Sequence, residues 1–174
     1  MRINRIKKKM RNGEPVFGIM IKEARNINIA EILEIAGFDY FVIDMEHAFY
    51  DMSDITEILQ FARKIDITCV VRIPRLDYAY VAKTLDMGAE GIWVPHLDTA
   101  EQAKDLVRFG KYPPEGIRGA AVPAFRLKER QEFKAAADYY RTVNDETLLL
   151  AQLKGREAIG NIEAITALPR HGVA

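Results

Sequence analysis

The stretch Phe38-Asp39-Tyr40-Phe41-Val42-Ile43-Asp44 decides the fold class of this chain. Its apolar side chains follow one another almost without a break, which is typical of a strand buried on both faces of a parallel sheet. Similar short apolar runs occur at residues 16–21, 68–73, 91–95 and 147–153. Segments with helical spacing separate these runs, so the pattern predicts an α/β fold built on a parallel sheet.

The helices expected between the strands carry their own boundary signals. Ser53 and Thr99 have the side-chain oxygen that caps a helix N-terminus, and Gly37 and Gly88 are placed to end helices. After residue 110 the pattern is looser, with one weak strand expected near Ile117. The expected helices cover residues 27–36, 53–64, 77–87, 100–109, 126–143 and 156–167.

Two architectures fit this alternation. An open doubly wound sheet would be complete within the 174 residues, whereas a (β/α)8 barrel typically needs ~250 residues. A barrel with about six of its eight units would leave open sheet edges, which are a liability unless something covers them. On pattern alone the open sheet is favoured, and residues 1–174 are expected to form a single domain.

Composition narrows the functional classes. Hydrophobic residues make up 49% of the chain and charged residues 29%, as in ordinary globular proteins. Lys+Arg 25 balances Asp+Glu 25, so charge gives no case for a nucleic-acid or membrane partner. Cys69 is the one cysteine, which excludes an intrachain disulfide and fits a reducing, cytoplasmic compartment. No apolar run approaches the ~20 residues of a membrane span, and the basic N-terminus lacks a signal-peptide core.

Reactive side chains follow the expected strands, where parallel α/β folds gather their functional groups. The densest group is Asp44-Met45-Glu46-His47. Histidine is the side-chain type suited to proton transfer near neutral pH, so His47 would serve as a proton acceptor, although a loop histidine beside solvated acids is the simpler interpretation. Arg72 ends an apolar strand and needs an anionic partner, which is either Asp44 or Glu46, or a substrate carboxylate.

Other side chains give weaker signals. His96 lacks a partner at metal-ligand spacing, so a structural role is favoured over a second base or a ligand. The sequence has no zinc or EF-hand calcium pattern and no glycine-rich nucleotide-binding loop. Cys69 lies in mid-strand and is interpreted as an inert core thiol.

Taken together, five segments in chain order resemble the HpcH/HpaI aldolases, which are class II 2-oxo-acid aldolases. Each segment is weakly specific alone, but the series is specific and extends over about residues 10–168. The matching segments are Phe38–His47, Val70–Pro74, Leu85–Pro95, Tyr112–Gly119 and Gln152–Ile165.

The resemblance implies a (β/α)8 barrel, here incomplete with about six of eight units, in place of the open sheet. It also implies a carbon–carbon lyase that cleaves a 4-hydroxy-2-oxo acid to pyruvate and an aldehyde, with Mg, Mn or Co as cofactor. By the same resemblance His47 is the catalytic base, Asp86 orients it, and Arg72 binds the pyruvate carboxylate and steadies the enolate. Gln152 matches a glutamine at the substrate and metal site.

Two departures from the family pattern bear on the metal. Lys154 stands where the family has a metal-binding glutamate, and an ammonium group offers a metal no lone pair. The family's second metal ligand, an aspartate on the next strand, is absent from a chain that stops at Ala174. We therefore expect metal binding to be weak or absent and metal-dependent activity to be strongly reduced.

Three consequences of these departures stay open. The chain is an inactive shortened relative, or a homo-oligomer whose neighbours cover the missing part, or an enzyme in which Lys154 supplies the positive charge of the metal. A salt bridge from Lys154 to Glu46 or Glu157 is the simpler role for that lysine. The competing functional class is a non-catalytic, self-associating barrel remnant that binds small keto acids.

Overall fold

The computed structural model describes residues 2–167. Within this part of the chain, five parallel strands form one sheet whose order follows the chain, β1-β2-β3-β4-β5. A doubly wound sheet reverses its strand order at a switch point, and this sheet has no such reversal. The strands are β1 (Gly18–Ile21), β2 (Tyr40–Asp44), β3 (Thr68–Arg72), β4 (Gly91–Val94) and β5 (Leu148–Ala151).

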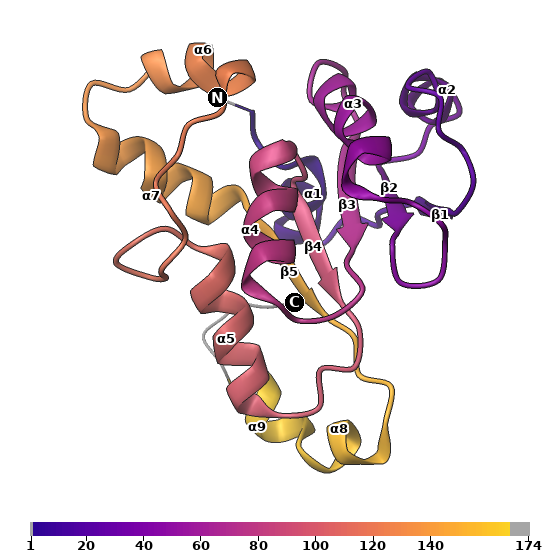
Figure 1. Ribbon diagram of the computed structural model, residues 1–174, viewed down its shortest axis with the longest axis vertical. Helices are drawn as coiled ribbons and strands as arrows, with labels where there is room; N and C mark the ends of the chain where they lie inside the picture. Colours follow the sequence, from indigo (N-terminus) through magenta and orange to yellow (C-terminus); the bar gives the residue numbers. More distant parts are fainter. Residues whose placement is uncertain (1, 168–174) are drawn as a thin grey trace.

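The first four helices that connect the strands pack on one face of the sheet, side by side in chain order (Figure 1). One-sided winding and sequential strand order are the features of a (β/α)8 barrel, so the open doubly wound sheet favoured by pattern alone is wrong. The described residues contain five of the strands, one fewer than expected. These helices are α2 (Ile29–Ile35), α3 (Met52–Ala62), α4 (Tyr78–Met87) and α5 (Ala100–Gly110).

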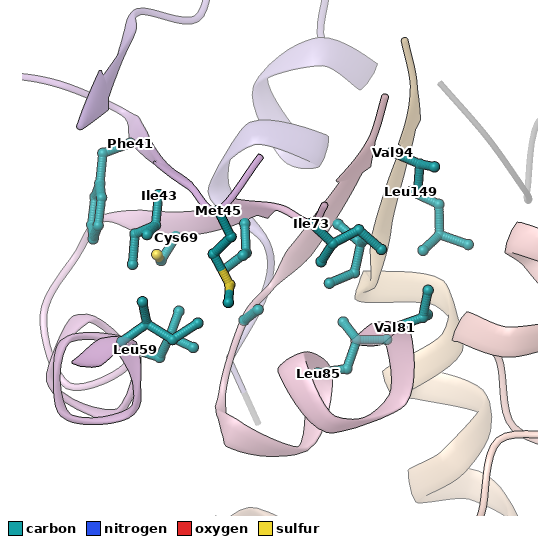
Figure 2. Close-up of a cluster of buried hydrophobic side chains, with 14 of the residues drawn as sticks. Phe41, Ile43, Met45, Leu59, Cys69, Ile73, Val81, Leu85, Val94 and Leu149 are labelled. Carbon is teal, nitrogen blue, oxygen red and sulfur yellow. The ribbon is translucent and has the colours of Figure 1, made fainter. Parts of the chain in front are cut away.

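The main core lies between the sheet and these helices. Outward-pointing strand residues such as Phe41, Ile43 and Leu149 meet Leu59 of α3 and Leu85 of α4 (Figure 2). All are nearly inaccessible to solvent, so the apolar runs of the sequence are explained by burial on this face. Cys69 belongs to the same cluster, and burial raises the pKa of its thiol well above the ordinary value, as expected of an inert core thiol.

The opposite face, which we call the inner face, is covered in part by helix α1 (Arg5–Arg11), which the sequence analysis did not predict. Ile6 of α1 packs against Val70 and Leu148. A cavity of about 360 Å³ extends from Ile6 along this face to Gln152 at the end of β5. Strand residues on the inner face include Met20, Tyr40, Val42, Asp44, Thr68, Val70, Arg72, Trp93, Leu148 and Leu150.

The segment between α5 and β5 differs from the expectation. No strand forms near Ile117, whose side chain is 53% exposed, because polar contacts rather than apolar burial order this loop. The helix expected over residues 126–143 is divided at residues 132–135, and the one expected over 156–167 is divided at Asn161. The elements are η1 (Ala124–Arg126), α6 (Leu127–Gln131), α7 (Ala136–Glu146), α8 (Arg156–Gly160) and α9 (Ile162–Thr166).

Two helix caps test the boundary predictions. Thr99 caps α5 as predicted, and Gln102 completes a capping box by accepting from the backbone N–H of Thr99. Ser53 does not cap α3, because Asp51 takes that position and accepts hydrogen bonds from the backbone of Ser53 and Asp54.

Within residues 2–167 no helix is long and apolar enough to cross a membrane. Pro169 and His171 lie outside the described residues.

Candidate active site

Asp44 and Arg72 form the floor of the site at the carboxyl ends of β2 and β3. They are register partners, so their side chains meet on the inner face. The Arg72 Nε donates to Asp44 Oδ1 at 2.9 Å, and Nη2 donates to Oδ2 at 2.7 Å. The side chain of Asp44 is 0% exposed and that of Arg72 is 8% exposed. A forked, charge-assisted pair of this kind holds the guanidinium in one orientation.

This pairing sets the protonation states of both groups. Burial raises the pKa of Asp44, but hydrogen bonds from Arg72 and from the backbone of His47 and Glu46, with the nearby positive charge, outweigh it. The pKa of Asp44 therefore lies below its usual range. The hydrogen bond to Asp44 raises the pKa of Arg72 despite burial. Both groups are charged at neutral pH.

Glu46 is the shared contact of the rim, by which we mean the carboxyl ends of the strands and the loops that follow them. Its Oε2 lies 3.3 Å from Arg72 Nη1, and its Oε1 accepts a hydrogen bond from Lys154 Nζ at 2.6 Å. The Nε2 atoms of His47 and His96 each lie 3.4 Å from the same Oε1. One carboxylate thus has two permanent cations and two imidazoles around it.

His47 lies in the turn after β2, and Asp44 shapes that turn. Asp44 Oδ1 accepts from the backbone N–H groups of Glu46 at 3.0 Å and His47 at 3.2 Å. The His47 side chain is 55% exposed, so the imidazole is open to a ligand. Because His47 and Arg72 both contact the carboxylate of Glu46, the imidazole and the guanidinium converge at the same end of the sheet.

His96 and the end of β5 complete the rim cluster. His96 has a positive φ of 53°, a conformation that only a few per cent of non-glycine residues adopt. Lys154 Nζ lies 3.5 Å from His96 Nε2, and Gln152 Oε1 lies 3.5 Å from Arg72 Nη1. The salt bridge expected between Lys154 and Glu46 is present. We define the rim cluster as Asp44, Glu46, His47, Arg72, His96, Gln152 and Lys154.

Asp86 is not brought to this cluster within the chain. It lies in the last turn of α4, which runs from the carboxyl end of β3 back toward the start of β4. Its carboxylate instead pairs with the buried guanidinium of Arg118 at 2.6 Å. Within residues 2–167 the His47 imidazole contacts Glu46 at 3.4 Å, and the Asp44 carboxylate holds the backbone of His47.

The donor set of the rim does not fit a divalent cation. Both Asp44 oxygens accept from Arg72, and the two Glu46 oxygens face Arg72 and Lys154. An ion bound to Glu46 would meet the ammonium of Lys154 at close range. Among residues 2–167, no three His, Cys, Asp or Glu side chains are grouped to hold a metal ion.

Comparison with known proteins places the chain in a family. The model of the HpcH/HpaI aldolase/citrate lyase family matches residues 19–173. The chain belongs to this family. The resemblance seen in the sequence is therefore confirmed.

Family members of known activity are similar over almost the whole chain. A hydroxypyruvate/pyruvate aldolase of Roseobacter denitrificans is 36% identical over 166 residues, covering 95% of this chain and 63% of the relative. The protein of that name from Agrobacterium fabrum is 37% identical over 165 residues, covering 95% of this chain and 60% of the relative. This chain thus spans about three fifths of the length of these relatives.

A solved structure gives the same fold. The HpcH/HpaI aldolase of Desulfitobacterium hafniense superimposes with a TM-score of 0.87 at 34% identity, covering 97% of this chain and 64% of that one. A family member from Burkholderia cenocepacia gives a TM-score of 0.80 at 30% identity. The five-stranded sheet is thus the corresponding part of the family fold.

Sequence reasoning placed most of the rim cluster but missed its organisation. It treated Glu46 as a partner for Arg72 or Lys154, whereas the structure makes it the contact shared by four side chains. The signal was available, because Glu46 follows Asp44 by two positions and shares its face if the strand pattern persists. The contact of Lys22 with Asp44, at 3.8 Å, was not predicted.

Proposed function

We propose that this chain forms the pyruvate-binding part of a 2-oxo-acid aldolase, a carbon–carbon lyase that cleaves a 4-hydroxy-2-oxo acid to pyruvate and an aldehyde. The observation that supports it is the convergence of His47 and Arg72 on one carboxylate at the rim. A base and a fixed guanidinium that contact the same carboxylate fit the two ends of a small keto acid. The family, and the similarity of the chain to hydroxypyruvate/pyruvate aldolases, support the same reaction class.

In the proposed reaction His47 is the proton acceptor. His47 removes the proton from the C4 hydroxyl. The C3–C4 bond then breaks, and the electron pair of that bond moves into the enolate of pyruvate. The C4 fragment leaves as an aldehyde, and the enolate then takes a proton at C3. The exposure of the imidazole and the fixed turn after β2 suit a general base.

Arg72 binds the carboxylate of the keto acid in this proposal. Its Nε and Nη2 are committed to Asp44, which leaves Nη1 as the nitrogen that faces Glu46 and Gln152. A substrate carboxylate would either share Nη1 with Glu46 or displace Glu46 from it. Pre-orientation by Asp44 means that the guanidinium does not have to be ordered when the substrate binds.

Exchange of the pyruvate C3 protons in D2O tests the function without an aldehyde partner. Proton NMR follows the loss of the methyl signal, which reports enolate formation. We expect exchange with the wild-type chain and a loss of about 100-fold or more in His47→Gln, since a general base contributes about 10²–10⁴-fold. Arg108→Ala, which removes an exposed ion pair on α5, is the control and should exchange normally. Equal rates in wild type and His47→Gln would refute the proposal.

Self-association is the second part of the proposal. In the described residues β1 and β5 are the edges of the sheet, and the inner face between them carries the 360 Å³ cavity. Unpaired edges and an open apolar face favour a homo-oligomer. Light scattering of the full chain tests this, and a monomer at all concentrations would exclude it. The single buried Cys69 is compatible with the cytoplasm as the compartment.

A further inference from the structure

We propose that the ammonium of Lys154 supplies the positive charge at which this site binds the oxygen atoms of a 2-oxo acid or its enolate, without a divalent metal ion. The inference rests on the proposed function and names its electrostatic component. It follows from the position of Lys154 at the end of β5, across the rim from Arg72, with both cations on the carboxylate of Glu46.

The charges of the rim favour an anion. Three basic groups, Lys22, Arg72 and Lys154, contact two carboxylates, those of Asp44 and Glu46. The two cations and two carboxylates of the rim cluster balance, so with neutral histidines Lys22 gives these five groups a sum of one positive charge, which a monocarboxylate would neutralise. A divalent cation would raise the same sum to three positive charges and would be opposed by repulsion.

Lys154 also has the geometry to serve a ligand. Its ammonium carries three N–H donors, of which Glu46 takes one at 2.6 Å, and His96 Nε2 lies within 3.5 Å. Its side chain is 24% exposed, against 7% for Glu46, so the lysine faces the open side of the rim. A third donor is therefore available to an incoming oxygen.

The chemistry needs no additional reagent. When His47 takes a proton from C3 of pyruvate, the electron pair of the C–H bond forms the C2–C3 double bond, and the π pair of the C2 carbonyl moves onto the C2 oxygen. Negative charge develops on that oxygen, and a fixed ammonium beside it stabilises the enolate more than the neutral ketone. Protonation at C3 returns pyruvate, and no electron is gained or lost.

Binding of oxalate, an analogue of the pyruvate enolate, tests the inference by titration calorimetry in the presence of a chelator. We expect oxalate to bind wild type equally well with chelator and with Mn²⁺, and Lys154→Met to bind at least about tenfold more weakly. Lys154→Arg keeps the charge and should retain binding, which separates a loss of charge from a loss of fold. Lys104→Met, which removes an exposed pair on α5, should bind as wild type does.

A second variant tests the same inference in the opposite direction. Lys154→Glu places a carboxylate beside Glu46 and Gln152 and should create Mn²⁺ binding, detected by electron paramagnetic resonance, that wild type lacks. Oxalate binding to wild type that requires Mn²⁺, or unchanged binding by Lys154→Met, would overturn the inference. Chelator-resistant oxalate binding without proton exchange would refute the proposed function alone, and proton exchange abolished by chelator would refute this inference alone.

Discussion

The buried pair of Asp44 and Arg72 gives a prediction whose size follows from the structure. Asp44→Asn keeps the shape of the side chain and removes its charge, so the guanidinium loses a partner that it holds through two short hydrogen bonds. Both side chains are at most 8% exposed. Breaking a buried ion pair by removing one charge costs about 3–5 kcal/mol of the free energy of unfolding.

Urea unfolding followed by the fluorescence of Trp93 is the assay. Trp93 is the one tryptophan of the chain and the register neighbour of Arg72, so its signal reports this part of the sheet. With a slope of ~2 kcal/mol per M, the midpoint of Asp44→Asn should fall by about 1.5–2.5 M. The matched control is Asp105→Asn, an exposed partner of Arg108, which should lose no more than about 0.5 kcal/mol.

A double substitution makes the reasoning falsifiable. Asp44→Asn combined with Arg72→Met removes both charges, keeps the Oδ1 that accepts from the backbone of Glu46 and His47, and leaves the contact of Glu46 with Lys154 in place. The desolvation cost of the two charges is then removed together with their attraction, so most of the lost stability should return. A loss below about 1 kcal/mol in Asp44→Asn, or a double variant no more stable than the single one, would contradict the account.

Three further outcomes are expected. Burial raises the pKa values of Asp39 and Asp44, but hydrogen bonds from basic partners outweigh burial and hold both pKa values below the ordinary range. The stabilisation that these two carboxylates give is therefore complete above pH ~4, and it is lost as the pH falls through their lower pKa values in the folded state. Thermal melts of wild type should show this loss on acidification, and Asp39→Asn should flatten the profile. A methyl group at Gly116 would lie 2.3 Å from a backbone carbonyl oxygen, so Gly116→Ala should lose about 1–3 kcal/mol in urea unfolding, whereas Gly160→Ala, with open space around it, should not. Thr99→Ala removes the cap of α5 and should lower the free energy of unfolding by about 1 kcal/mol, and Thr99→Ser should retain it.

The strands were predictable from the sequence because each is a short apolar run that must be buried. Helix α1 was not, because Ile6 is the one buried residue of a segment otherwise held by charge. Lys9 and Arg5 of α1 both pair with Asp39, a contact with a part of the chain about 30 residues away. Periodicity records burial within a segment and contains no signal for partners of this kind.

Hydrophobic periodicity also could not predict on which side of the sheet the connecting helices lie. Apolar runs separated by helices predict a parallel sheet, but they do not specify on which face successive helices lie. The weak strand predicted near Ile117 is also wrong. Ile117 is an isolated apolar residue that is 53% exposed in a loop. The family resemblance corrected the first error by supplying the topology that composition and spacing lack.

The rim cluster was predictable in part because the end of each strand is also the end of its apolar run. Asp44, His47, Arg72 and Lys154 were all selected in that way. The sequence did not predict the pairing of Asp86 with Arg118, because α4 carries Asp86 away from the carboxyl end of β3 toward the start of β4. Which polar side chains share a contact depends on register, and register is a property of two segments together.

The sequential strand order has a consequence for how the protein is made. Each strand after the first pairs with its predecessor in the chain, so the surface on which it docks has already left the ribosome when the strand emerges. Within residues 2–167 no strand has to wait for a strand farther along the chain, and the growing sheet shelters each new apolar run as it appears. Synthesis and assembly then proceed in the same direction, one β/α unit at a time.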